Sequence, residues 1–194
     1  MIKIKNVAIF GGTFDPIHRG HIYLVEQILD SRRFDQIIVV PAGNPWQRPT
    51  IASAADRLAM ARLAFTTKEI LVSDCEVVRS APSYAIDTVR ELKRDNDASF
   101  TWIIGSDALN GLESWHQIQE LAALVDFLVI IRPGYSLSGL KVPPFIRWQT
   151  LEIGALDISA TEIRTALHEH REVSNLITDP VLSYIKEKRL YGAA

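Results

Sequence analysis

Cysteine is nearly absent from the sequence. Cys75 is the single cysteine among 194 residues, so no internal disulfide can form. No motif for a reactive thiol surrounds Cys75, and a small buried side chain is therefore its expected role. Long apolar runs are absent too. None approaches the ~20 residues that span a bilayer, and residues 1–6 predict a strand rather than the core of a signal peptide. These features predict a cytoplasmic protein with no membrane partner.

An excess of charge of one sign is also lacking. The chain has 21 Lys and Arg residues, 23 Asp and Glu residues and a net charge of −2 at pH 7. We therefore expect no nucleic-acid partner, since such proteins carry clustered basic residues. The length of 194 residues, without repeats or low-complexity tracts, predicts one domain over 1–194 with a substantial core. The sequence leaves the oligomeric state open, and a homo-oligomer is compatible with it.

Two common phosphate-binding motifs do not occur. The chain contains no G-x-G-x-x-G turn and no G-x-x-x-x-G-K-[ST] loop, so a P-loop lysine cannot hold phosphate here. The chain instead has G-G-T-F-D-P-I-H-R-G-H over residues 11–21. An apolar run at 7–10 precedes this segment. Residues 22–29 follow it with one apolar helical face, which consists of Ile22, Val25, Ile28 and Leu29.

The residue types in this segment suit phosphate chemistry. Gly11 and Gly12 let the backbone turn sharply and let a ligand approach it closely. The following helix offers free N–H groups and the positive end of its dipole to an anion. His18 and His21 flank the same turn, so the sequence predicts a phosphate site with built-in catalytic donors. The alternative is a structural role, with one histidine as a helix cap and the other in the core.

Strands and helices alternate along the chain. Strand-like apolar runs predict strands at 7–10, 36–40, 69–73, 100–104 and 127–131, and residues 149–153 are predicted as a final strand. Helices are predicted at 22–29, 53–65, 84–93, 160–168 and 180–188, with an irregular connection at 134–147. Their helical spacing runs through Leu58, Ala61, Leu63 and Ala64 in the second helix and through Ile86, Val89 and Leu92 in the third. Strands without polar alternation suit a parallel sheet covered on both faces. We therefore expect an α/β fold, a doubly wound parallel sheet with short C-terminal helices.

Candidate polar residues follow several of the expected strands. Ligands of open α/β sheets bind beyond the carboxyl ends of the strands. The residues that follow strand ends are His18 and His21, Arg48, Asp107, Arg132 and Ser159. We expect them to converge at one edge of the sheet. Imidazole N–H groups placed there can neutralise charge that grows on a phosphate during transfer, and one such donor is typically worth about 10²–10³ in rate.

Five ordered segments carry a resemblance to a known family. They are residues 11–21, S-Y-A-I-D-T at 83–88, I-G-S-D-A-L at 104–109 followed by Trp115, R-P-G at 132–134, and I-S-A-T-E-I-R at 158–164. The chain resembles the nucleotidyltransferase superfamily marked by H-x-G-H, and within it the bacterial nicotinate-nucleotide adenylyltransferases. The resemblance implies a Rossmann-like nucleotidyltransferase fold. It also implies that nicotinate mononucleotide is joined to the adenylyl group of ATP, which gives nicotinate adenine dinucleotide and pyrophosphate in NAD biosynthesis.

The resemblance also implies roles for individual residues. The implied catalytic residues are His18, His21 and Arg164. The implied ATP-binding residues are Gly11, Gly12, Thr13, Phe14, Gly105, Asp107, Ser159, Thr161 and Arg132. The implied mononucleotide-binding residues are Arg48, Tyr84, Ala85 and Trp115. In this interpretation the nicotinate ring stacks on Trp115, and the first amides of the helix at Tyr84 and Ala85 bind its carboxylate.

Several of these residues also have structural interpretations. Ser159 and Glu162 fit a capping box, which is compatible with phosphate binding at the same helix start. Asp107 fits an N-cap for a helix that begins at Ala108. Trp115 fits an ordinary core or surface aromatic residue. These interpretations stay open at the level of the sequence.

One segment departs from the family pattern. Many members carry P-P-H-K after the second strand, whereas this chain has N-P-W-Q-R at 44–48. Arg48 keeps a cation where the family has lysine and is expected to contact phosphate, while Gln47 receives no role. No His, Cys, Asp or Glu cluster has the spacing of a permanent metal site, so we expect Mg²⁺ to arrive with ATP. Asp15 fits either assistance to that ion or plain turn chemistry.

Other functions remain as alternatives. Pantetheine-phosphate adenylyltransferases have threonine in place of the first histidine, and cytidylyltransferases share H-x-G-H but leave the segments of Tyr84 and Trp115 unexplained. Class I aminoacyl-tRNA synthetases need far longer chains. A non-catalytic nucleotide sensor is the alternative from another class, and the presence of both histidines and Arg164 argues against it.

Overall fold

The sheet has the predicted parallel, doubly wound architecture. The computed structural model describes residues 5–46, 49–131, 142–154, 156 and 158–193. These residues form a six-stranded sheet in the order β3-β2-β1-β4-β5-β6, with every neighbouring pair parallel. The strands are β1 (Lys5–Gly12), β2 (Gln36–Pro41), β3 (Ile70–Val72), β4 (Ala98–Gly105), β5 (Asp126–Ile131) and β6 (Trp148–Glu152). From β1 the chain adds β2 and β3 on one side and then β4, β5 and β6 on the other, so the strand order reverses between β1 and β4, where such folds place their ligands.

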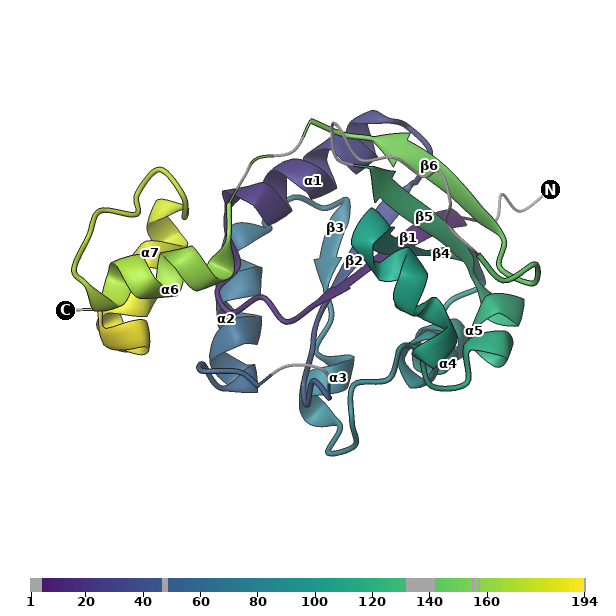
Figure 1. Ribbon diagram of the computed structural model, residues 1–194, viewed down its shortest axis with the longest axis horizontal. Helices are drawn as coiled ribbons and strands as arrows, with labels where there is room; N and C mark the ends of the chain where they lie inside the picture. The colour runs from purple at the N-terminus through teal and green to yellow at the C-terminus, as the bar shows by residue number, and fades with distance from the viewer. Residues whose placement is uncertain (1–4, 47–48, 132–141, 155, 157, 194) are drawn as a thin grey trace.

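Helices connect the strands and extend beyond them. The α-helices are α1 (Arg19–Asp30), α2 (Ala54–Ala64), α3 (Cys75–Val78), α4 (Ala85–Asp95), α5 (Ile118–Leu124), α6 (Ala160–His168) and α7 (Asp179–Glu187). Two 3₁₀ helices, η1 (Ser106–Ser114) and η2 (Leu190–Gly192), complete the set among the described residues. Figure 1 shows α6 and α7 together at one side of the molecule, next to α1 and α2 and away from β6. The predicted short C-terminal helices are therefore confirmed.

The sheet separates two apolar layers. Along β2, Ile37 and Val39 join a cluster with residues of α1, α2, α6 and α7. The alternate residues Ile38 and Val40 join a second cluster with residues of α4 and α5. Because both faces of the sheet are covered, β2, β4 and β5 contain continuous buried apolar runs, which is why the sequence predicted them. The edge strand β6 (W-Q-T-L-E) has no buried residue and no such run.

The buried face of α2 differs from the predicted spacing. Leu58 and Ala61 are buried as expected, but Leu63 is 38% exposed. The inward face includes Met60 and, unexpectedly, Arg57, which is only 1% exposed. The buried face of α2 therefore includes Arg57 and Met60 and leaves out Leu63.

Some predictions fall on residues outside the described ranges. Arg48, Arg132 and Gln47 lie there, as does most of the irregular connection predicted at 134–147. Within the described ranges, no helix combines the length and apolar character needed to cross a bilayer.

Candidate active site

A cavity of about 340 Å³ opens at the carboxyl ends of β1, β2 and β4. The predicted site residues that line it are Gly11, Gly12, Thr13, Tyr84, Ala85, Gly105, Asp107 and Trp115. They come from segments far apart in the sequence. Of the residues predicted to converge at one edge of the sheet, only Asp107 lines this cavity among those that the structure describes. The other described candidates do not line this cavity and are considered below: His18, His21, Phe14, Ser159, Thr161 and Arg164.

Aromatic side chains group along the cavity wall. The Tyr84 ring stacks on His116, with centroids 4.2 Å apart and an angle of 25° between the planes, and the Trp46 ring lies 6.2 Å from Tyr84. Trp115 is half-buried and meets Trp102 edge-on at 86°. Flat aromatic faces of this kind suit a planar heteroaromatic ligand. The sequence analysis identified Tyr84 and Trp115 but not Trp46 and His116. Trp46 lies in the 44–48 segment and His116 follows Trp115, but neither belongs to a motif that would assign it a role.

The glycine pair acts by close approach rather than by a sharp turn. Gly11 and Gly12 end strand β1, and neither has a positive φ. The left-handed residue of this segment is Phe14, with φ of 51°. A Cβ atom on Gly11 would stand 2.8 Å from the Trp102 ring, so a larger residue cannot fit without a shift. The predicted glycine turn is therefore wrong in its geometry, while the predicted bare backbone at the cavity wall is confirmed.

Asp107 does not cap a helix. Helix η1 begins at Ser106, two residues before the predicted start at Ala108, and its N-cap is Gly105. The Asp107 side chain is exposed, lines the cavity and makes no cap hydrogen bond. The capping interpretation is therefore wrong, and the carboxylate faces the space where a ligand would lie.

The two histidines form a stacked pair at the start of α1. Their ring centroids are 3.7 Å apart, with an angle of 25° between the planes. The His18 backbone N–H donates to Nδ1 of His21 over 3.3 Å. A neutral imidazole that accepts at Nδ1 carries its proton on Nε2, so His21 keeps an N–H donor for another partner. His21 is thus a helix cap and a potential donor at once.

Burial makes both rings neutral. It lowers the pKa of His18 to about 4. Burial, together with the neighbouring His18, also lowers the pKa of His21 well below its usual value. The Nδ1 atom of His18 is buried and faces the His21 N–H in a capping-box arrangement, but that N–H donates to the His18 carbonyl, and Nδ1 has no hydrogen bond among the described residues. Buried polar atoms are rarely left unpaired, and those that are often belong to functional sites.

The backbone amides at the start of α1 are less available than predicted. The Arg19 N–H donates to the carbonyl of Leu176 over 2.9 Å, and the His21 N–H donates to the carbonyl of His18 over the same distance. The expectation of free amides at this helix start is therefore wrong at these two positions. The imidazoles, rather than these amides, are the groups that this turn can present to an anion.

Aromatic packing connects the histidine pair to the cavity. Phe10 lines the cavity, and its ring centroid lies 6.1 Å from that of His21. The Phe14 ring is buried between them, 5.4 Å from Phe10 and 5.1 Å from His21 in edge-on contact. Phe14 therefore supports the His21 ring, and its side chain is not exposed to a nucleotide.

The start of α6 lies beside His18. A Cβ atom on Gly20 would stand 3.1 Å from Nδ1 of His18 and 3.6 Å from Cβ of Ile158, which directly precedes Ser159. Gly20 thus leaves the room in which the His18 ring and this segment meet. Ser159 is the N-cap residue of α6 as predicted, but its side chain makes no cap hydrogen bond, so the predicted capping box is wrong.

Arg164 binds the turn that precedes the histidines. Its Nη1 donates to the backbone carbonyl of Asp15 over 2.7 Å, and its Nη2 donates to Oγ1 of Thr161 over 3.1 Å. The side chain is half-buried, and Thr161 is exposed. These two hydrogen bonds hold the guanidinium against the loop that precedes the histidines.

Comparison with known proteins places the chain in a family. A family model described as cytidylyltransferase-like matches residues 9–166. A probable nicotinate-nucleotide adenylyltransferase of Acidothermus cellulolyticus is 35% identical, over 95% of this chain and 93% of that protein. A second protein of the same name, from Synechococcus sp. strain JA-3-3Ab, is 37% identical over 96% of this chain and 95% of its own. The chain belongs to the nicotinate-nucleotide adenylyltransferase family.

Solved structures agree on the fold of this family. The nicotinic acid mononucleotide adenylyltransferase of Plasmodium falciparum, complexed with NaAD, matches with a TM-score of 0.74 and 23% identity over 98% of both chains. The structure named as a putative nicotinate-nucleotide adenylyltransferase of Vibrio parahaemolyticus matches with a TM-score of 0.64 and 22% identity, over 93% of this chain and 97% of that one. The predicted Rossmann-like nucleotidyltransferase fold is therefore confirmed.

A buried polar cluster beneath the site was missed by sequence reasoning. In this member of the nicotinate-nucleotide adenylyltransferase family, Arg57 donates to the carbonyls of Thr13 over 2.7 Å, Gly43 over 3.3 Å and Ala52 over 3.4 Å. It thereby ties the loop after β1 to the loop after β2. Burial lowers the pKa of Arg57, and the nearby Asp15 carboxylate opposes that effect. The sequence held one indication that Arg57 is buried, because Arg57 lies four residues before Ala61 and so shares the predicted inner face of the helix.

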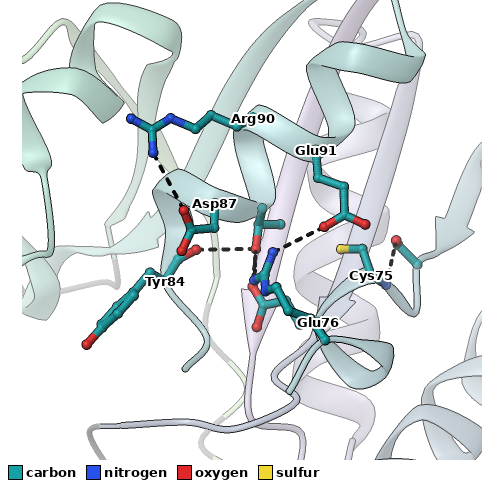
Figure 2. Close-up of polar contacts among 9 residues, drawn as sticks. Cys75, Glu76, Tyr84, Asp87, Arg90 and Glu91 are labelled. Atoms are coloured by element: carbon teal, nitrogen blue, oxygen red, sulfur yellow. Dashed lines mark hydrogen bonds and ion pairs between the residues drawn. The ribbon is translucent and has the colours of Figure 1, made fainter. Parts of the chain in front are cut away.

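A second buried network supports the wall at Tyr84. Oγ1 of Thr88 donates to Oε1 of Glu76 over 2.6 Å, and Arg79 links Thr88, at 3.1 Å, to Glu91, also at 3.1 Å. Figure 2 shows Glu76 and Glu91 within this chain of contacts, with the Tyr84 ring pointing away from it. Burial raises the pKa of Glu76, and hydrogen bonds such as that from Thr88 oppose the effect. This network fixes the first turn of α4, where the predicted substrate amides lie.

The loop after β2 is fitted tightly against this network. A Cβ atom on Gly43 would stand 1.8 Å from the carbonyl oxygen of Glu76. The Asn44 N–H donates to Oγ of Ser83 over 3.0 Å, and the Ser83 N–H donates to the carbonyl of Asn44 over 2.9 Å. The two loops that flank Trp46 and Tyr84 are therefore held together by backbone contacts.

The described residues do not fit a resident metal ion. No group of three His, Cys, Asp or Glu side chains among them is arranged to hold one. The Asp15 carboxylate, the candidate ligand in the first loop, already accepts hydrogen bonds from the amides of Ile51 and Ala52 and from the hydroxyl of Tyr191. Of the two interpretations of Asp15, the structure favours the structural one.

Proposed function

We propose that this chain transfers the adenylyl group of ATP to nicotinate mononucleotide, which gives nicotinate adenine dinucleotide and pyrophosphate. In this reaction a phosphate oxygen of the mononucleotide forms a bond to the α-phosphorus of ATP. The bond from that phosphorus to the oxygen leading to the β-phosphate breaks, and pyrophosphate leaves. The reacting phosphate is already a nucleophile at neutral pH, so the protein needs to align the groups and neutralise charge.

The observation that supports this proposal most is the neutral histidine pair, with His18 buried and His21 partly buried, which aromatic packing connects to the cavity. His21 keeps a donor on Nε2 because its Nδ1 accepts from the His18 backbone. His18 has a buried ring nitrogen without a partner among the described residues. Donors held in place before the substrate arrives need no rearrangement as charge grows on the α-phosphate. We therefore give His18 and His21 the role of donors to the reacting phosphate, and Arg164 the role of a fixed positive charge beside them.

The cavity supports the rest of the assignment. Gly11, Gly12 and Thr13 expose backbone at its wall, and Gly105 with Asp107 is proposed to receive the ribose of ATP. A carboxylate such as that of Asp107 accepts hydrogen bonds from ribose hydroxyls. Ser159 and Thr161, at the start of α6, are proposed to contact the outer phosphates together with Arg132.

The aromatic wall is proposed to hold the mononucleotide. Trp115 offers a half-buried flat face for the pyridine ring. Ala85 is the first residue of α4, and its backbone amide is proposed to bind the pyridine carboxylate. The expectation of a second free amide at Tyr84 is wrong, because the Tyr84 N–H donates to the carbonyl of Pro82 over 2.9 Å. Arg48 is proposed to contact the phosphate of the mononucleotide. Mg²⁺ is proposed to enter as the ATP complex, bound by phosphate oxygens and water, and no side chain is given to it.

Pyrophosphate release tests the proposal directly. The purified chain is mixed with Mg²⁺ and ATP, and pyrophosphate is measured after nicotinate mononucleotide is added. We expect release that depends on the mononucleotide and a matching amount of nicotinate adenine dinucleotide. Replacement of ATP by CTP is the control for cytidylyl transfer, and ATP alone is the control for hydrolysis. Release that needs CTP, or that occurs equally without the mononucleotide, would contradict the proposal.

The same assay tests the choice between acid and amide substrates. The amide of nicotinamide mononucleotide presents an NH₂ donor where the backbone N–H of Ala85 requires an acceptor. We therefore expect a much higher kcat/KM for nicotinate mononucleotide. In the complex with nicotinamide mononucleotide, the NH₂ group would face a backbone N–H, and two donors without an acceptor in a binding site are costly. Comparable values for the two substrates would remove the proposed role of the Ala85 amide.

A further inference from the structure

The C-terminal segment reaches back to the loop that carries the histidines. The hydroxyl of Tyr191, in η2, donates to Oδ1 of Asp15 over 2.7 Å, and the two residues are 176 positions apart in the sequence. Both side chains are buried, with Tyr191 8% exposed and Asp15 5% exposed. Burial and this hydrogen bond raise the pKa of Tyr191, so the hydroxyl keeps its proton and remains a donor. The C-terminal segment therefore makes a polar contact inside the site region.

Asp15 is the centre of the contacts that shape this loop. Its carboxylate also accepts from the amides of Ile51 over 2.7 Å and Ala52 over 3.1 Å. Its backbone carbonyl accepts from Nη1 of Arg164 over 2.7 Å. His18 follows three residues later as the N-cap of α1. A displacement of Asp15 would therefore move both the guanidinium of Arg164 and the start of the helix that holds the histidine pair.

Tyr191 is held in an unusual backbone conformation. Its φ and ψ are 58° and 19°, in the left-handed region that bulky residues rarely adopt. The adjoining Gly192 has φ of 79°, and a Cβ atom there would stand 3.0 Å from Nδ1 of His168 in α6. Such backbone outliers persist where the surrounding structure requires them, and they gather at functional sites. The segment is thus packed against α6 in a conformation that brings the Tyr191 hydroxyl to Asp15.

We propose that Tyr191 is a positioning residue for adenylyl transfer, whose hydroxyl holds Asp15 and thereby aligns Arg164 and the histidine pair. This inference rests on the proposed function. It places the last turn of the chain in the active-site architecture, although Tyr191 does not line the cavity. The positive charges of Arg57 and Arg164 act on the Tyr191 hydroxyl in the direction opposite to the negative charge of Asp15.

A second tyrosine of the C-terminal region supplies a matched control. The hydroxyl of Tyr184, in α7, donates to Oδ1 of Asp56 in α2 over 2.9 Å. This bond also joins the C-terminal region to the rest of the fold, but it has no contact with Asp15 or Arg164. The variants Tyr191→Phe and Tyr184→Phe each remove one oxygen atom and one tyrosine–aspartate hydrogen bond. They differ in whether the bond leads to the histidine pair.

The test compares kcat for the two variants with saturating Mg²⁺–ATP and nicotinate mononucleotide. We expect Tyr191→Phe to lower kcat on the order of 10-fold, since small misplacement of catalytic groups has large effects on rate, and to leave the KM for the mononucleotide within about twofold. Tyr184→Phe should keep the wild-type kcat. The folded fraction of each variant is measured by near-ultraviolet circular dichroism and used to normalise kcat, so that lower stability is not mistaken for slower chemistry.

A second readout does not depend on turnover. Nuclear magnetic resonance of ¹⁵N-histidine-labelled protein should show altered His18 and His21 ring signals in Tyr191→Phe and unaltered ones in Tyr184→Phe. Unchanged kcat and unchanged histidine signals in Tyr191→Phe would overturn the inference, as would equal losses in both variants. Wild-type protein without any adenylyl transfer would contradict the proposed function instead, while the histidine signals would still test the positioning contact.

Discussion

Binding of ATP should cause the histidine pair to take up one proton. Burial lowers the pKa of His18 to about 4 in the free protein, so the ring is neutral before the nucleotide arrives. A phosphate oxygen about 4 Å from an imidazolium ring stabilises it by about 4 kcal/mol at an effective dielectric constant of about 20, which corresponds to about 3 pH units. The pKa of His18 in the complex should therefore rise to about 7.

The sign of the effect follows from linkage. A pKa that rises on binding means that the complex holds more protons than the free protein, so affinity increases as the pH falls. With the values above, the Kd for a non-hydrolysable ATP analogue should fall about 40-fold between about pH 7 and about pH 5. The pair should take up one proton rather than two, because the His21 ring lies 3.7 Å away and a charge on His18 lowers its pKa further.

Isothermal titration calorimetry in buffers of different ionisation enthalpy measures this uptake. The control is His18→Asn, whose side chain stays neutral over this pH range. The phosphate groups of the analogue also exchange protons with the buffer, and this contribution is expected to be the same for both proteins. The difference between wild type and His18→Asn therefore reports the ring. Equal proton uptake and equal pH dependence of Kd in the two proteins would refute the contact between His18 and phosphate.

Three further substitutions test other parts of the site. His18→Ala should leave the fold intact and lower kcat by at least about 10²-fold, the scale of one transition-state donor, and a near-normal kcat would remove His18 from the mechanism. Trp115→Ala should mainly raise the KM for the mononucleotide, and an effect confined to the KM for ATP would contradict stacking. Gly43→Ala should lower the free energy of unfolding by about 3 kcal/mol in urea denaturation, because the new Cβ atom meets the Glu76 carbonyl at 1.8 Å. Gly111→Ala is its control, since no atom lies within 4 Å of the added Cβ; an equal loss in both would contradict the steric argument.

The elements that the sequence predicted are those with a long apolar signal. Strand β5 and helix α6 show this, because each packs a continuous or periodic set of apolar residues into the core. The helices that were missed have no such signal. Helix α3 has four residues, and α5 has seven and follows Gln117, which adopts a left-handed conformation and makes no cap hydrogen bond. Short helices of this kind are stabilised by tertiary packing, which local sequence does not report.

The candidate site was predictable only where a motif marked it. The H-x-G-H segment and the residues after β4 were found because glycine and histidine at fixed spacing have few structural reasons to occur together. Arg57 and Glu76 were not found, because a single charged residue in a helical pattern usually faces solvent. Their burial depends on hydrogen bonds to loops far away in the sequence, such as those from Arg57 to Thr13 and Gly43.

The structural and the catalytic interpretation of the histidines are compatible, and the geometry explains why. As a cap, His21 uses only Nδ1, which accepts from the His18 backbone. That bond fixes the tautomer and the orientation of the ring, so the proton stays on Nε2. Stacking on His18 and edge contact with Phe14 then prevent rotation about the side-chain bonds. The cap bond therefore orients the donor before the nucleotide binds. Without the bond to Nδ1, the His21 ring would be less well oriented and would stabilise the transition state less.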